Sequence, residues 1–255
     1  MKDRHIPRTR FGDIVAEFLP PARRKGSRRG ADKVVILCGG MPSAPRSGPL
    51  LPFLARKGYW VFYPRYRGSW ESGGKFLRYS PEEDVLNIID ALPRGFKDIY
   101  AGKRYRIKTP EICVIGGSFG GPAAILASRD PRVTRAVAVA PVIDWRREGK
   151  SEKAAWMEKF LREAFGEAYR FDHKDWLKLK TGKFYSPAAH AKEIDGRKIF
   201  MIHAKNDGVV PYRASEAFAK RTGAQLLLLR SGGHLRMSVI AAPRLWKKVG
   251  PFLRG

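Results

Sequence analysis

The chain lacks the features that mark disulfide-rich, metal-binding and membrane-spanning proteins. It has only two cysteines in 255 residues, Cys38 and Cys113, and each lies inside an apolar, strand-like run. Two such thiols are a poor disulfide framework, which favours buried free thiols, a reducing compartment and, by default, the cytoplasm. Neither an H-E-x-x-H nor a C-x-x-C pattern occurs, so we expect no bound metal and no other cofactor.

Long apolar runs are absent as well. No window approaches 18 consecutive apolar residues, so we expect no membrane span and no membrane partner. Residues 1–13 are basic, but no apolar run follows them, and we therefore expect no signal peptide. The length suits one large domain and no internal repeat is evident, so we predict a single domain over residues 1–255.

Acidic residues are scarce relative to basic ones. The chain has 50 lysines and arginines against 24 aspartates and glutamates, a formal net charge of +26. Such a charge attracts polyanions, and salt screens the attraction. The basic residues are spread along the whole chain and accompany no recognition-helix, RNP-type or zinc-finger pattern, so we expect only non-specific attraction and no specific nucleic-acid partner. The densest basic run, residues 23–29, is typical of a solvated hairpin loop.

What the chain does contain is an alternation of apolar strands with helical patterns. Unbroken apolar runs predict strands at residues 33–38, 59–63, 112–115, 136–140, 198–202 and 225–229. Helices are predicted between them, one of them starting with Ser80 as N-cap and Pro81 at its first position. Strands that are apolar on both faces are typical of parallel sheets with helices on both sides. The predicted fold class is α/β, a mostly parallel doubly wound sheet, with antiparallel edge strands from residues 1–30.

The stretch from about residue 145 to 185 interrupts this alternation. It lies between the fourth and fifth predicted strands and carries many aromatic residues among many charges. We interpret it as a small, mostly helical lid inserted over the carboxyl end of the sheet. An extra helical pair packed on the side of the domain is the alternative interpretation.

A G-x-S-x-G motif over residues 116–120 predicts the nucleophile of a hydrolase. It follows the third predicted strand and precedes a predicted helix, and its central residue is Ser118. In a tight strand-to-helix turn the serine hydroxyl is exposed, and the flanking glycines are needed because side chains there would collide with the turn.

Two further residues complete a possible catalytic triad. Asp207 and His234 each follow the end of a predicted strand, and catalytic groups of open α/β sheets lie at that carboxyl edge. The chain order serine, acid, histidine is the order of α/β-hydrolases. We therefore predict Ser118 as nucleophile, Asp207 as acid and His234 as base. We expect His203, at the end of the fifth strand, to be a packed and hydrogen-bonded imidazole.

An acyl-transfer reaction also requires donors for an oxyanion and a surface for the substrate. The backbone amide of Phe119 is one expected donor, and the amide of Gly40 or Met41 is the second. The alternative for this glycine pair is a simple tight turn. Three aromatic residues of the proposed lid region are candidates to line an apolar acyl pocket, with structural packing as the alternative: Trp145, Trp156 and Tyr185.

Five segments together resemble the catalytic domain of the prolyl oligopeptidase family of serine peptidases. They are Y-R-G-S at 66–69, G-G-S-F-G-G at 116–121, A-P-V-I-D-W at 140–145, S-P at 186–187 and D-G-V-V-P at 207–211. The resemblance covers roughly residues 31–245. It implies an α/β-hydrolase fold and hydrolysis of peptide or ester bonds through an acyl-enzyme, with a peptide or acyl ester as substrate. The alternatives are a small-molecule carboxylesterase and a non-catalytic basic binding protein on a hydrolase scaffold.

The chain departs from this family pattern in two respects. The N-terminal β-propeller that the family usually carries has no room here, so we expect none. Cys38 stands where relatives often have histidine or tyrosine, and Met41 replaces a common proline.

Overall fold

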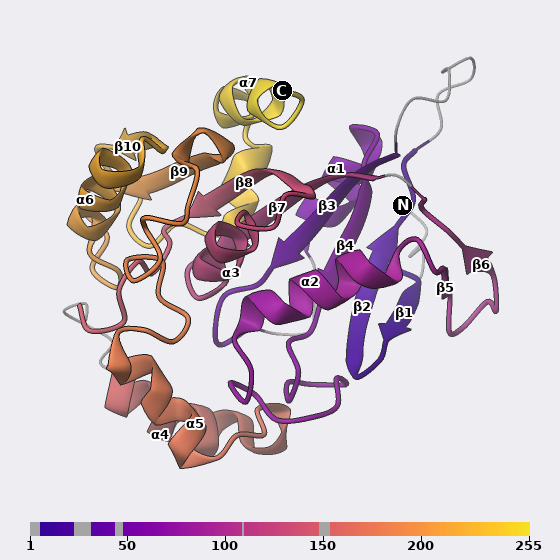
Figure 1. Cartoon of the computed structure of the whole chain (residues 1–255), viewed down its shortest axis with the longest axis horizontal. Coiled ribbons are helices and arrows are strands. Elements are labelled where there is room, and N and C mark those ends of the chain that lie inside the picture. Colours follow the sequence, from indigo (N-terminus) through magenta and orange to yellow (C-terminus); the bar gives the residue numbers. More distant parts are fainter. Residues whose placement is uncertain (1–5, 23–31, 44–47, 109, 148–153) are drawn as a thin grey trace.

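In the part of the chain that the structure describes, eight strands form one mostly parallel sheet, as the apolar runs predicted (Figure 1). The computed structural model describes residues 6–22, 32–43, 48–108, 110–147 and 154–255. In sheet order the strands are β1 (Arg8–Phe11), β2 (Ile14–Leu19), β4 (Trp60–Pro64), β3 (Asp32–Cys38), β7 (Pro110–Gly117), β8 (Val133–Val139), β9 (Ile199–Ala204) and β10 (Gln225–Leu229). Six of these strands, β4, β3, β7, β8, β9 and β10, run parallel to one another, and β1 and β2 add an antiparallel edge next to β4.

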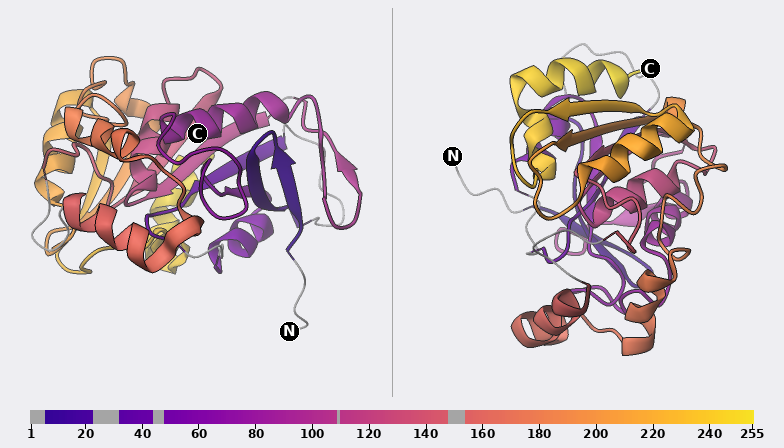
Figure 2. Two further views of the ribbon diagram at one scale, coloured as in Figure 1. Left: turned by 90° about the horizontal axis from the view of Figure 1, so that it is seen from below. Right: turned by 90° about the vertical axis from the view of Figure 1, so that its left-hand side faces the viewer.

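Helices cover both faces of this sheet, which confirms the doubly wound arrangement (Figures 1 and 2). They are α1 (Leu50–Arg56), α2 (Pro81–Ala91), α3 (Gly120–Ala127), α6 (Tyr212–Thr222) and α7 (Pro243–Phe252). Successive side chains of a strand point to opposite faces, so β3 sends Val34 and Ile36 to the core beneath α2 and α3. It sends Val35 and Leu37 to the core beneath α1 and α7. Both faces of the strand are buried, which is why its sequence is an unbroken apolar run.

The N-terminal region forms the predicted antiparallel edge, since β1 pairs with β2 and β2 pairs with β4. The basic run at residues 23–29 lies outside the described residues. A separate two-stranded hairpin, β5 (Phe96–Lys97) with β6 (Arg104–Tyr105), was not predicted. Strands of two residues are too short to produce an apolar pattern.

The segment between β8 and β9 contains α4 (Ala154–Phe165), η1 (Gly166–Ala168), α5 (His173–Leu177) and η2 (Lys178–Thr181). In Figure 1, α4 and α5 lie together below the sheet, apart from the helices that flank it. The amide of Trp70 donates to Ala168 O at 2.9 Å, and the amide of Arg170 donates to Gly68 O at 2.7 Å. Because residues 66–76 follow the carboxyl end of β4, this pairing ties the segment to the carboxyl edge of the sheet. No helix in the described part of the chain has the length and apolarity that a membrane span requires.

Candidate active site

Ser118 lies in a strained turn between β7 and α3. Its φ is +51°, a left-handed conformation that residues with side chains rarely adopt. A Cβ atom on Gly116 would lie 2.0 Å from Gly120 O, and one on Gly120 would lie 2.1 Å from Cys38 O. Only glycine fits at these two positions, so the motif permits a strand-to-helix turn tight enough to present the serine hydroxyl.

The structure brings the three predicted side chains into one hydrogen-bonded chain. Nε2 of His234 lies 2.9 Å from Oγ of Ser118, and its Nδ1 lies 2.9 Å from Oδ2 of Asp207. The parallel pairing of β9 with β10 places the two loops that carry Asp207 and His234 side by side. Oδ1 of Asn206 accepts a hydrogen bond of 2.9 Å from the amide of Gly233 and so joins the loops directly.

The Asp207 carboxylate is held by four hydrogen bonds. Oδ1 accepts from the amides of Val209 and Val210 at 2.9 and 3.0 Å. Oδ2 faces ring nitrogens of His234 and His203 at 2.9 and 3.2 Å. Burial of the carboxyl group favours its neutral form, but these donors outweigh burial and hold the pKa of Asp207 well below its ordinary value. The group is therefore ionised and acts only as an acceptor.

His203 is fully buried and hydrogen-bonded, as expected, but its contact with the acid was not predicted. Its Nε2 lies 3.2 Å from Oδ2 of Asp207 and 3.1 Å from Val210 O, and its Nδ1 lies 2.9 Å from Oγ of Ser215. Both partners of Nε2 are acceptors, so Nε2 carries a hydrogen. The only sequence signal for this contact was the four-residue spacing from His203 to Asp207 across the end of β9. Within the described ranges, no group of three or more His, Cys, Asp or Glu side chains is arranged to hold a metal ion.

The loop after β3 lies directly against the serine. A Cβ atom on Gly40 would lie 3.6 Å from both Cβ of Ser118 and Gly117 O. The amides of Gly40, Met41 and Phe119 donate no hydrogen bond to another described residue. The loop that carries Gly40 and the turn that carries Phe119 therefore both adjoin Ser118, and no described residue accepts a hydrogen bond from the predicted donor amides.

The three aromatic candidates for the acyl pocket have different surroundings. Trp145 is partly exposed, its ring centre lies 5.6 Å from that of Phe119, and its indole N–H donates to Tyr185 O at 2.8 Å. Tyr185 is only 1% exposed and its hydroxyl donates to Phe119 O at 2.5 Å, so it packs beneath the turn and lines no surface. Trp156 is 49% exposed on α4 and stacks on Phe160 at 5.0 Å.

A serine in a strand-to-helix turn, bridged to a carboxylate by an imidazole at the carboxyl edge of a parallel sheet, defines a serine hydrolase of the α/β-hydrolase fold. The chain belongs to the prolyl oligopeptidase family, which its residues 49–241 match. Both the resemblance expected from the five sequence segments and the predicted fold are thereby confirmed. The chain is a serine hydrolase that acts on peptide or ester bonds.

Several solved structures are similar to this chain over nearly all of its length. An esterase of Pyrococcus furiosus aligns with a TM-score of 0.65 and 22% identity, covering 98% of this chain and 91% of that one. An acylaminoacyl peptidase of Pyrococcus horikoshii aligns with a TM-score of 0.64 and 20% identity, covering 98% of this chain and 41% of that one. A puromycin-hydrolyzing peptidase of Mycobacterium tuberculosis has a TM-score of 0.67 and 18% identity, covering 97% and 38%. No curated protein matches the chain in sequence.

Proposed function

We propose that Ser118, His234 and Asp207 form the catalytic triad and that the enzyme hydrolyses short peptides through an acyl-enzyme. The observation that carries this proposal is the position of the His234 imidazole, 2.9 Å from the serine hydroxyl on one side and 2.9 Å from the carboxylate on the other. Membership of the prolyl oligopeptidase family supports peptide bonds as the substrate class.

The geometry supports a stepwise mechanism. The ionised Asp207 accepts the hydrogen of Nδ1, which leaves Nε2 of His234 to take the proton of Ser118 as its oxygen attacks the carbonyl carbon. The amides of Phe119 and Gly40, with Met41 adjacent, bind the oxygen that becomes negative. His234 then gives its proton to the leaving group and activates the water that hydrolyses the acyl-enzyme.

A second candidate is a carboxylesterase for small acyl esters. The observation that favours it is the alignment with the Pyrococcus furiosus esterase, which covers 91% of that protein, against 38–41% of the two peptidases. The chemistry at the serine is the same for both candidates. They differ in whether the leaving group is an amine or an alcohol.

A substrate panel tests both candidates. Short aminoacyl and peptidyl amides and short acyl esters are assayed with the wild type and with Ser118→Ala in parallel. We expect cleavage of both classes by the wild type and a loss in kcat of at least about 10³-fold in the variant. Cleavage of esters without amides would replace the peptidase by the esterase. Equal rates in both proteins would refute the role of Ser118.

We also propose that residues 1–255 form one domain in which residues 145–185 act as a lid. We propose in addition that Trp145 contacts the acyl group of the substrate. The ring contact of Trp145 with Phe119, next to the nucleophile, supports this contact. Trp145→Ala is expected to raise KM for aromatic and long acyl esters by about fivefold while acetyl esters change less than about twofold, as loss of an apolar contact would produce. A uniform change across acyl groups would contradict the contact.

We further propose a cytoplasmic location and only diffuse attraction to polyanions. Two buried free thiols support the first proposal. The spread of basic residues along the chain supports the second.

A further inference from the structure

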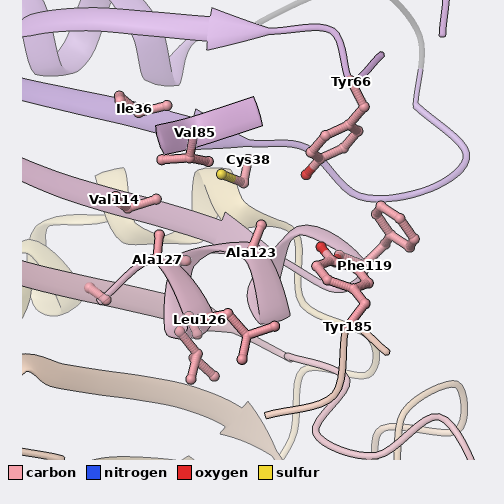
Figure 3. Packing of buried hydrophobic residues seen from close by; sticks show 14 of the residues in the cluster. Ile36, Cys38, Tyr66, Val85, Val114, Phe119, Ala123, Leu126, Ala127 and Tyr185 are labelled. Atoms are coloured by element: carbon pink, nitrogen blue, oxygen red, sulfur yellow. The ribbon is translucent and has the colours of Figure 1, made fainter. Parts of the chain in front are cut away.

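A buried tyrosine lies behind the loop that carries one of the oxyanion donors. Tyr66 follows β4, is 5% exposed and packs its ring 5.5 Å from that of Phe119. Its hydroxyl lies 2.9 Å from Gly39 O and donates to it. Figure 3 shows Tyr66 together with Cys38, Phe119 and Tyr185 beside the ends of the central strands. None of the triad contacts described above involves this side chain.

The direction of the Tyr66 hydrogen bond follows from the groups around it. Gly39 O is a carbonyl oxygen and is able only to accept a hydrogen bond. The hydroxyl hydrogen of Tyr66 therefore goes to Gly39 O. Burial raises the pKa of Tyr66 well above its ordinary value, so the hydroxyl stays protonated and remains a donor.

The carbonyl that Tyr66 holds belongs to the same peptide unit as the Gly40 amide. Among the described residues the only cis peptide bond is Met41–Pro42, so the unit that joins Gly39 to Gly40 is trans. In a trans unit the C=O and N–H point in opposite directions. Gly39 O lies on the inner side of the turn, where a Cβ atom on Gly120 would come within 2.5 Å of it. Because the carbonyl of Gly39 is fixed on the inner side of the turn, the amide of Gly40 points away from that side.

The two oxyanion donors differ in what holds their peptide units. The amide of Phe119 shares its unit with Ser118 O, which accepts from the amide of Gly121 at 2.9 Å at the start of α3. Backbone structure therefore fixes that unit. Gly40 lies in a loop after the end of β3, where no strand or helix fixes the backbone. There the carbonyl of the peptide unit accepts from a side chain, that of Tyr66.

We propose that Tyr66 is a positioning residue that orients the Gly40 amide and strengthens it as an oxyanion donor. Hydrogen bonding at the oxygen of a peptide polarises its N–H group, so the same contact that fixes the direction also increases the donor strength. The inference rests on the proposed function, because it requires that Gly40 bind the oxyanion. It adds a residue that contacts neither the substrate nor the triad.

The test is Tyr66→Phe, which removes the hydroxyl and keeps the ring packing. Removal of a whole oxyanion donor costs about 10²–10³-fold in kcat, and a donor that is present but misdirected should cost about tenfold. We expect that loss in kcat with KM changed less than about twofold, because the oxyanion exists only after attack. A peptidyl or acyl boronic acid, which forms an adduct that resembles the tetrahedral intermediate, should bind about tenfold more weakly.

Two control variants separate orientation from general loosening of the core. Tyr59→Phe removes a hydroxyl that has no partner among the described residues, from a ring in the opposite core, and should leave kcat unchanged. Tyr185→Phe removes a hydroxyl from Phe119 O in the same turn, but the peptide unit from Phe119 to Gly120 carries neither candidate donor. We expect its loss in kcat to be at most about a fifth of that in Tyr66→Phe, if direction of the Gly40 amide is the cause.

Three results would overturn the positioning role of Tyr66, and a fourth would refute the proposed function. A kcat within about twofold of wild type for a folded Tyr66→Phe, or an equal loss in Tyr185→Phe, would overturn the positioning role. If Tyr66→Phe loses stability, the ratio of boronate affinity to substrate affinity in the folded fraction still decides, and an unchanged ratio overturns the proposal. A wild type that neither turns over a substrate nor reacts with a fluorophosphonate would refute the proposed function itself, which is a result distinct from either of these.

Discussion

Asp207, the acid of the proposed triad, shows how individual hydrogen bonds set the charge state of a buried carboxyl group. Its two oxygens accept from two backbone amides and face two imidazoles, so burial of the carboxyl group does not neutralise it. An ionised Asp207 fixes the hydrogen of His234 on Nδ1 and so leaves Nε2 available to the serine. The groups that secure this tautomer come from β9, from the loop after β9 and from the loop after β10.

Asp207→Asn tests this role in the reaction. The amide keeps the shape of the side chain but donates through its nitrogen, which favours the wrong tautomer of His234. We expect kcat to fall by about 10⁴-fold with little change in KM, since the loss falls on the reaction and not on binding. The measurement is steady-state hydrolysis of the best substrate of the panel. A loss below about tenfold would mean that Asp207 does not direct the imidazole.

The same carboxylate should make stability depend on pH. The pKa of Asp207 is lowered in the folded protein, so its stabilising contribution is fully present above the ordinary carboxyl pKa and is lost as pH falls through the folded value. The difference in unfolding free energy between the wild type and Asp207→Asn should therefore be larger at about pH 6 than at about pH 3. Urea unfolding at both pH values measures it, with Ser118→Ala expected to follow the wild type. A difference that is independent of pH would contradict the hydrogen-bond account.

The sequence predicted the site residues that follow strand ends. It missed the residues whose side chains contact the site from elsewhere in the fold. Ser118, Asp207 and His234 each stand at a recognisable point of the chain, and parallel strands bring such points to one edge. The contacts of His203 with Asp207 and of Tyr66 with Gly39 O depend on where side chains meet after folding. The aromatic pattern left two interpretations of Tyr185 open, a place in the acyl pocket and structural packing, and its 1% exposure agrees with the second.

At the scale of elements, the site depends on how closely α3 approaches β3. Gly120, at the start of α3, lies against Cys38 O and Gly39 O, and a Cβ atom there would come within 2.1 and 2.5 Å of these atoms. The contact holds the turn that presents Ser118 beside the loop that presents Gly40. The glycine is thus required by a close approach of two backbones, not by an unusual φ of its own.

Gly120→Ala should therefore damage both folding and the site. Neither colliding atom belongs to a flexible side chain, so we expect a loss of about 3–5 kcal/mol in unfolding free energy, in the range of severe core substitutions. The matched control is Gly208→Ala, where a Cβ atom would meet nothing within 4 Å, and which should change stability by less than about 0.5 kcal/mol. Urea unfolding of both variants checks this. Equal stability of the two would contradict the close-packed turn.

Element boundaries were predictable where burial dominates and less so where local contacts decide. The six apolar runs each coincide with a strand. A strand buried on both faces must be apolar throughout, whereas β10, at the edge of the sheet, is apolar but only partly buried. Ser80 does stand at the N-cap of α2, but its hydroxyl bonds the carboxylate of Glu82 instead of a backbone amide. The sequence could not distinguish these two partners, which lie within one helical turn of each other.

At the scale of the whole molecule, the formal net charge is +26, and no lysine or arginine takes part in the hydrogen bonds that join Ser118, His234 and Asp207. Many carboxylates are already paired with arginine, as in the buried contact of Glu17 with Arg65 at 3.1 Å. The excess is basic and lies on the surface: no acidic residue follows Glu216, and α7 presents Arg244, Lys247 and Lys248 to solvent. A diffuse charge of this kind attracts polyanions without selecting among them.

Binding to heparin should therefore be strong at low salt and be lost at high salt. We expect retention at about 0.05 M NaCl and complete elution by about 0.5 M, where the Debye length has fallen to about 4 Å. Double-stranded and single-stranded nucleic acids of different sequence should bind equally at each salt concentration. A sequence preference that survives at high salt would contradict the diffuse account.

If Ser118 is a nucleophile activated by His234, a reagent that modifies activated serines should label it covalently. The folded wild type is treated with a fluorophosphonate and the modified peptide is located by mass spectrometry. We predict one label per chain, attached to Ser118, with Ser118→Ala unlabelled and His234→Ala labelled at least about 10³-fold more slowly. A folded wild type that takes up no label, or takes it up at another residue, would contradict the account.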